Sequence, residues 1–248
     1  KNNLNYLSTP GIKSFTLGLG QTNIKRKIEC LDIVVKTCAS VQLVSQNKKR
    51  IFEKDKLEYT FRTLKSLYKS ANSLKEKYKD ILIKFTIIDS GSSQSDFDKI
   101  KNLVKNQVFD SNFIKLDNTK IDKGNNMEST MSSIKKSFEL SEKFQDLIYF
   151  VEDDYIHKID ALSEMVLSYE KFSSILDDEI FLLSTDYPYL YKKLENSIVL
   201  IGDKYHWRSV EESLLTFMTS KKMIRKHFSK LIEMATKEDK PFEKNLHE

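Results

Sequence analysis

The chain has 248 residues, a formal net charge of +5 and 40% hydrophobic residues, which suits one large α/β domain better than two full domains. No apolar run approaches the roughly 18–20 residues needed to cross a bilayer, and residues 1–21 lack the apolar block of a secretory signal. We therefore expect a soluble, cytoplasmic protein with no membrane span. Two cysteines are too few for a disulfide framework.

The basic residues are spread along the whole sequence. The chain has 41 Lys and Arg, of which only five are Arg, and they are mixed with 36 Asp and Glu. A nucleic-acid-binding protein more often gathers Arg and aromatic residues on one face, so we expect no nucleic-acid partner. A basic nucleic-acid-binding domain stays a rival hypothesis, for which steep salt-dependent affinity is the test. An attraction for anionic substrates such as phosphates or acidic glycans also stays open.

Strand-like and helix-like patterns alternate in the first part of the chain. Apolar runs rich in β-branched residues predict strands at 31–38, 81–88, 113–116 and 147–151. Apolar residues at steps of three and four predict a helix over 56–78, and a second helix follows residues 124–126. Ser95 and Asp98 form a capping pair, which predicts the start of a helix between the second and third strands.

The later part of the chain is less regular. We expect a helix over 160–172, strands at 180–184, 198–201 and 214–218, and a helix that Ser220 caps. Repeated strand–helix units predict an α/β fold with a mainly parallel sheet and helices on both faces. We expect a single domain over 1–248, divided into a regular half at about 28–155, a second half at about 156–235 and a charged tail at 236–248.

Three adjacent carboxylates, Glu152, Asp153 and Asp154, directly follow the strand at 147–151. Like charges this close raise at least one pKa unless a cation lies among them, and their oxygens suit Mg²⁺ or Mn²⁺. On an extended backbone Glu152 and Asp154 project to one side and Asp153 to the other. Because ligands bind at the carboxyl ends of strands in open α/β sheets, the sequence predicts a metal-bound ligand at this strand end.

Two other strand ends carry polar residues. The second strand runs into Asp89-Ser90-Gly91-Ser92, where hydroxyls and a carboxylate can bind a ribose or a base and glycine permits close backbone approach. The first strand ends near Thr37. In a doubly wound sheet the two ends lie side by side, so we expect one crevice that they share with the acidic triplet.

Together these strand ends resemble glycosyltransferases of the GT-A type, with family-2-like enzymes and N-acetylglucosaminyltransferase-type enzymes carrying Glu-Asp-Asp as the closest matches. Residues 89–92 resemble the family's Asp-Asp-Gly-Ser, with Ser90 in place of the second Asp, and residues 149–154 resemble its DXD segment, here beginning with Glu. The resemblance covers about residues 31–160. It implies a GT-A-type, Rossmann-like fold and metal-dependent transfer, assisted by Mn²⁺ or Mg²⁺, from a UDP- or GDP-sugar to a hydroxyl of a glycan, lipid or protein.

The resemblance also implies roles for individual residues. Asp154 would ligate the metal, Thr37 and Asp89 would contact the nucleoside, and Glu152 or Asp153 would reach the base or ribose. Residues 124–126 resemble an element of the family that abuts the donor. The residues expected to bind the nucleotide-sugar are Thr37, Asp89, Ser90, Asn125, Glu152 and Asp153.

An inverting transferase needs a general base for the acceptor hydroxyl. In the enzymes that this chain resembles, the base lies several tens of residues past the DXD segment, which implies Asp186, Glu211 and Glu212 as candidates. Aromatic and cationic side chains nearby suit an acceptor sugar or phosphate, namely Tyr187, Trp207 and Arg208. By the same resemblance, His206 or His247 would complete the metal shell.

One alternative of another class remains. A GT-A-like domain that has lost catalysis would serve as a glycan- or protein-binding module, and it would bind nucleotide without transferring sugar. Loop shapes set the sugar pockets, so the sequence leaves the donor sugar, the acceptor and the linkage open. It also leaves open whether transfer inverts or retains the configuration of the sugar.

Overall fold

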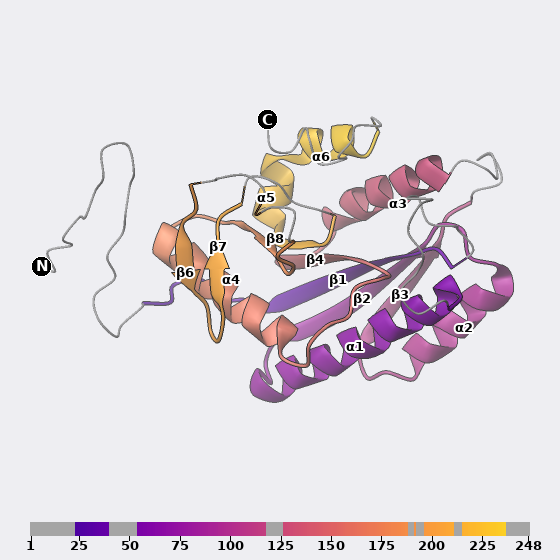
Figure 1. Ribbon diagram of the computed structural model, residues 1–248, viewed down its shortest axis with the longest axis horizontal. Helices are drawn as coiled ribbons and strands as arrows, with labels where there is room; N and C mark the ends of the chain where they lie inside the picture. Colours follow the sequence, from indigo (N-terminus) through magenta and orange to yellow (C-terminus); the bar gives the residue numbers. More distant parts are fainter. Residues whose placement is uncertain are drawn as a thin grey trace, which may run out of the picture.

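The computed structural model describes residues 23–39, 54–117, 126–187, 191, 196–210 and 215–236. These residues form a six-stranded sheet, a separate two-stranded hairpin and helices packed against both faces of the sheet (Figure 1). The strands are β1 (Cys30–Thr37), β2 (Leu82–Asp89), β3 (Asp110–Lys115), β4 (Leu147–Glu152), β5 (Phe181–Leu183), β6 (Val199–Ile201), β7 (His206–Arg208) and β8 (Phe217–Ser220). The helices are α1 (Lys56–Lys77), α2 (Gln94–Lys105), α3 (Asn126–Ser141), α4 (Ala161–Leu176), α5 (Lys221–Lys226) and α6 (Phe228–Met234).

The sheet has the strand order β3-β2-β1-β4-β8-β5. Strands β1, β2, β3 and β4 pair in parallel, whereas β8 lies antiparallel between β4 and β5. The predicted α/β fold, with a mainly parallel sheet between helices, is therefore confirmed. The chain leaves β1 toward β2 and β3 on one side and returns to β4 on the other, so the strand order reverses between β1 and β4.

Alternating side chains of the central strands build two hydrophobic cores, one on each face of the sheet. Ile33, Val35 and Tyr149 pack against α1, α2 and α4 in the first core. Val34 and Phe150 pack against α3, α5 and α6 in the second core, opposite the first (Figure 1). The near-continuous apolar sequence of β1 and β4 follows from this burial on both sides.

Several element boundaries differ from the sequence prediction. Helix α2 is capped by Ser93, whose hydroxyl accepts a hydrogen bond from the amide of Asp96, and not by Ser95. The helix predicted after Ser220 is two short helices, α5 and α6, which meet at His227. His206–Arg208, which showed no strand pattern, pairs with β6 as strand β7.

The β6–β7 hairpin is attached to α4 through one buried carboxylate. Glu164 accepts hydrogen bonds from the indole N–H of Trp207 at 2.9 Å and from the backbone amide of Lys204 at 2.7 Å. A Cβ added to Gly202 would lie 2.3 Å from a Glu164 carboxylate oxygen, so this turn has no room for a side chain. None of the described helices is long and apolar enough to cross a bilayer.

Candidate functional site

The predicted site residues gather where the strand order reverses. Thr37 and Asp89 are partners in the β1–β2 register, and Lys36 and Glu152 are partners in the β1–β4 register. The carboxyl ends of three parallel strands therefore meet at one edge of the sheet. Such a reversal opens a crevice between the loops that leave in opposite directions, which is where open α/β sheets bind ligands.

Asp89 holds two of these strand ends together. Its carboxylate accepts hydrogen bonds from the hydroxyl of Thr37 at 2.9 Å and from the amide and hydroxyl of Ser92, the amide at 3.0 Å. The hydroxyl of Ser92 in turn accepts from the amide of Ala39 at 2.8 Å. Asp89 has no exposed surface, and Thr37 and Ser90 are also buried. These hydrogen bonds fix the ends of β1 and β2, and the predicted contact of these residues with a nucleoside stays a prediction.

Asp153 is the buried member of the acidic triplet, and it shares the neighbouring ammonium of Lys56 with Asp154. Its carboxylate accepts from the hydroxyl of Thr60 at 2.7 Å and from the amide of Cys38 at 3.2 Å, and it lies 2.6 Å from the ammonium of Lys56. Lys56 and Thr60 belong to the first turns of α1. Asp153 therefore joins the end of β1, the end of β4 and the start of α1, and it is buried in doing so.

Glu152 and Asp154 are the accessible members of the triplet. Their side chains are 33% and 50% exposed, and each lies 3.9 Å from a lysine ammonium, that of Lys36 and that of Lys56 respectively. Burial raises the pKa of both carboxyls, and the neighbouring carboxylates raise it further, while the lysines oppose this shift. The three carboxylates of the triplet thus outnumber the two lysines beside them.

Lys56 was missed by the sequence analysis. Although burial lowers its pKa, the carboxylates of Asp153 and Asp154 raise that pKa overall. The only sequence signal was a lysine at the first position of the predicted helix 56–78, where a cation opposes the helix dipole. A cation in that position indicates a nearby carboxylate.

The donor atoms present suit a divalent ion. Glu152 and Asp154 offer hard carboxylate oxygens, and burial, with a smaller effect of the neighbouring carboxylates, raises the pKa of both; a bound cation would favour their charged form. Within the described residues, no three His, Cys, Asp or Glu side chains are grouped to hold a metal by themselves, so His206 belongs to no such group. An ion here would need phosphate oxygens to complete its shell, as is usual for Mg²⁺.

Asp186 lies in a cluster that also contains Arg208 and Tyr191. Its carboxylate accepts two hydrogen bonds from the guanidinium of Arg208, at 3.0 and 3.3 Å, and a third from the hydroxyl of Tyr191. Burial raises the pKa of Asp186, but Tyr191 and Arg208 lower it to a greater extent. In this arrangement Asp186 is a weakened base, and Arg208 is engaged with protein groups.

The aromatic candidates have different surroundings. The hydroxyl of Tyr187 is hydrogen-bonded to that of Tyr155, directly after the acidic triplet, which brings Tyr187 to the same strand end. Trp207 packs edge-on against Phe172 at 6.2 Å between ring centroids, and its N–H is bound by Glu164. Trp207 therefore anchors the β6–β7 hairpin. Its predicted contact with an acceptor stays a prediction. Asn125, Glu211, Glu212 and His247 lie outside the described residues.

No protein-family model and no curated protein sequence matches this chain. Solved structures resemble it, and two of them show the degree of similarity. One is residues 1–349 of TarS from S. aureus, with 12% identity and a TM-score of 0.42; the match covers 80% of this chain and 49% of that one. The other is the galactosyltransferase LgtC in complex with donor and acceptor sugar analogues, with 13% identity, a TM-score of 0.40 and coverage of 87% and 70%. This chain thus spans about half of the TarS chain, and similarity of this degree does not identify its activity.

Proposed function

We propose that the chain is a metal-dependent, inverting glycosyltransferase that moves a sugar from a nucleotide diphosphate sugar to an acceptor hydroxyl. The observation that carries the proposal is the acidic triplet at the reversal of strand order between β1 and β4. Two carboxylates with raised pKa remain accessible there, and Asp89 and Asp153 fix the strand ends around them. The resemblance of residues 89–92 and 149–154 to the GT-A family supports the same activity.

The residues of the triplet would have separate structural and metal-binding roles. Asp153 orients the strand end through Lys56 and Thr60, while Asp154, with Glu152 beside it, would hold Mn²⁺ or Mg²⁺. When bound, the ion would neutralise the charge that develops on the departing diphosphate. The ammonium groups of Lys36 and Lys56, each 3.9 Å from one of these carboxylates, would assist in that neutralisation.

An acceptor hydroxyl must lose its proton in the transfer, and a carboxylate with a low pKa accepts that proton poorly. The hydrogen bonds from Arg208 and Tyr191 would have to be released from Asp186 before it could serve as the base. Glu211 and Glu212 remain the other candidates for this role.

Nucleotide binding tests the proposal directly. We expect UDP or GDP with Mn²⁺ to raise the melting temperature of the full chain, and Asp154→Asn to abolish the rise. Asp80→Asn, at an exposed turn after α1, removes the same charge and should leave the rise unchanged. If no nucleotide shifts the melting temperature, or if both variants behave alike, the proposed donor site is wrong.

The paired state of Asp186 favours a second candidate, a GT-A-like binding module that has lost catalysis. Such a module would show the nucleotide-dependent rise without releasing free nucleotide from any UDP- or GDP-sugar. Measuring nucleotide release over a panel of sugars, with glycan, lipid and peptide acceptors, separates the two candidates.

A further inference from the structure

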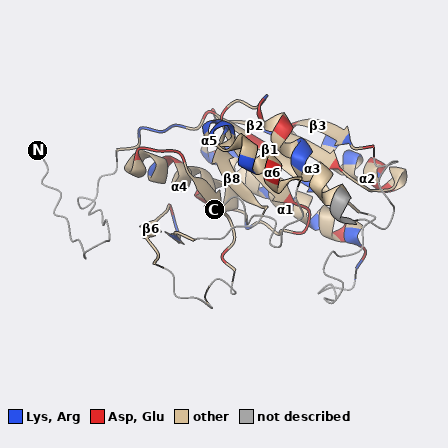
Figure 2. Ribbon diagram, turned by 90° about the horizontal axis from the view of Figure 1, so that it is seen from above, with Lys and Arg blue, Asp and Glu red and all other residues tan. Residues whose placement is uncertain are grey.

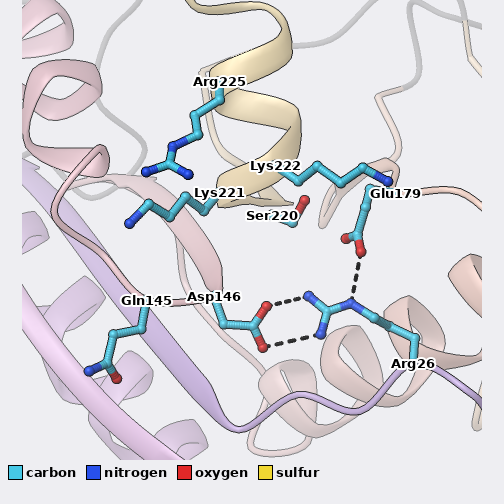
Figure 3. Close-up of a pocket in the computed structure, with 8 residues that line it drawn as sticks. All are labelled: Arg26, Gln145, Asp146, Glu179, Ser220, Lys221, Lys222 and Arg225. Atoms are coloured by element: carbon cyan, nitrogen blue, oxygen red, sulfur yellow. Dashed lines mark hydrogen bonds and ion pairs between the residues drawn. The ribbon is translucent and has the colours of Figure 1, made fainter.

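A cavity of about 300 Å³ opens near the amino ends of β1 and β4 (Figure 3). It is separated from the acidic triplet by the length of β4, which is about 20 Å for six residues. The cavity therefore lies outside the proposed donor site, and none of the residues in the triplet lines it. The lining residues are Arg26, Gln145, Asp146, Glu179, Ser220, Lys221, Lys222 and Arg225.

Both carboxylates of the cavity are already paired with one cation. Arg26 donates to the two carboxylate oxygens of Asp146 and, through Nε at 2.9 Å, to Glu179, as the dashed lines of Figure 3 show. The second oxygen of Glu179 accepts from the hydroxyl of Tyr169 at 2.8 Å. Hydrogen bonds therefore hold these three charged residues in place. The two carboxylates do not pair with the other cations that line the cavity.

The remaining cations come from a single turn of α5, the basic helix seen in Figure 2. Lys221 is held in place, because its ammonium donates to the carbonyl of Phe144 at 2.6 Å and its amide donates to the carbonyl of Asp146 at 2.8 Å. Arg225 is exposed, and within the described part of the chain its guanidinium has no hydrogen bond or ion pair. Lys222 lies at the rim, 3.9 Å from Asp178.

We propose that this cavity binds a phosphomonoester group. Four cations and two carboxylates line it, and the carboxylate of Asp178 lies beside Lys222, so an excess of one positive charge faces a phosphomonoester that carries about −1.5 to −2 at pH 7. The planar guanidinium of Arg225 suits two oxygens of one phosphate, and Lys221 and Gln145 also line the cavity. A volume near the lower end of the range for small-molecule sites, about 300–1,000 Å³, favours a small phosphorylated group.

Titration with glycerol 3-phosphate tests the proposal, followed by amide chemical shifts of the full-length chain. We expect saturable shifts at residues 220–222, and binding at least about fivefold weaker in Arg225→Ala, on the scale of one charged hydrogen bond. Lys226→Ala is the matched control, because it removes the next positive charge on α5 but does not line the cavity. We expect its affinity to equal that of the unaltered chain.

Equal weakening by the two substitutions would show general charge attraction and overturn the proposal, as would an absence of saturable shifts. Arg225→Lys keeps the charge but loses the planar group that can donate to two phosphate oxygens. We therefore expect its affinity for glycerol 3-phosphate to lie between those of the unaltered chain and Arg225→Ala. Neither substitution should change the response to UDP and Mn²⁺, so this proposal and the proposed donor site can fail separately.

A phosphomonoester can come from a soluble metabolite or from a lipid headgroup, and a second arm distinguishes these sources. Vesicles of phosphatidylcholine with phosphatidic acid present the same group at a membrane surface. Binding to these vesicles that Arg225→Ala weakens and Lys226→Ala does not would support the site and identify a lipid source. Binding of glycerol 3-phosphate alone would support the site with a soluble ligand.

Discussion

Lys56 and Asp153 form the most tightly enclosed ion pair of the candidate site. Their side chains are only 15% and 9% exposed, and the charged atoms lie 2.6 Å apart. Removing one partner of such a pair leaves an uncompensated charge away from water. We expect Lys56→Met to lower the free energy of unfolding by about 3 kcal/mol, as measured by urea denaturation at neutral pH.

The double variant Lys56→Met/Asp153→Asn should recover part of this loss, because no charge is then buried alone. Lys99→Met breaks an exposed pair with Asp96, and we expect it to cost less than about 1 kcal/mol. An equal cost for Lys56→Met and Lys99→Met would contradict the role given to Lys56.

The sequence predicted which strand ends carry the site but not what each side chain contacts. Strand alternation does not describe the whole triplet, because β4 ends at Glu152 and Lys56 lies near both Asp153 and Asp154. Asp89 is fully buried and bonded both by Ser92 of its own turn and by Thr37 at the end of β1, and the contact with Thr37 forms only after the two strands pair. Lys56 was missed for a simpler reason, since it is one lysine among many in the sequence.

At the scale of elements, His157 joins β4, α1 and β5. Its ring lies 2.9 Å from the hydroxyl of Tyr149, which also contacts Ser184, and its amide donates to Ser66 at 3.0 Å. Burial lowers the pKa of His157 to about 4, below the usual value of about 6.5. The folded protein therefore holds this ring neutral, and protonation favours the unfolded chain.

Because the folded pKa is depressed, the contribution of His157 to stability is complete above pH 6.5 and is lost as the pH falls toward 4. We expect the free energy of unfolding, measured with urea, to fall between pH 7 and pH 4.5 by about 2 kcal/mol more in the unaltered chain than in His157→Gln, whose side chain cannot titrate. His206→Gln alters an exposed histidine and should keep the full pH dependence. The same pH dependence in all three proteins would refute this assignment.

Sequence patterns predicted the strands of the first half of the chain better than they predicted how the later strands pair. Strands β1, β2 and β4 are apolar on both faces and stand out in any context. Strand β8 has only four residues, and its place between β4 and β5 is fixed by pairing with both. No local pattern specifies that position, because it depends on strands that are distant in the sequence, whereas the pairing of β7 with β6 is local and was missed because His206–Arg208 shows no strand pattern.

At the scale of the whole molecule, the central sheet separates two cores that share no side chains but do share strands. Phe138 of α3 packs against Phe150 at 5.2 Å and Phe217 at 6.4 Å between ring centroids, all in the second core. Trp207, the only tryptophan, packs against the first core on the opposite face. Its fluorescence therefore reports on one face of the sheet while a substitution acts on the other.

We expect Phe138→Ala to lower the free energy of unfolding by about 3–5 kcal/mol through the cavity it leaves. Because β1 and β4 contribute to both cores, this loss of stability should shift the unfolding transition equally whether it is followed by Trp207 fluorescence or by far-ultraviolet circular dichroism. Leu176→Ala, at a partly exposed position of α4, should shift both only slightly. A Trp207 transition that stays in place while circular dichroism shifts would mean that the two faces unfold separately, and that the sheet does not couple them.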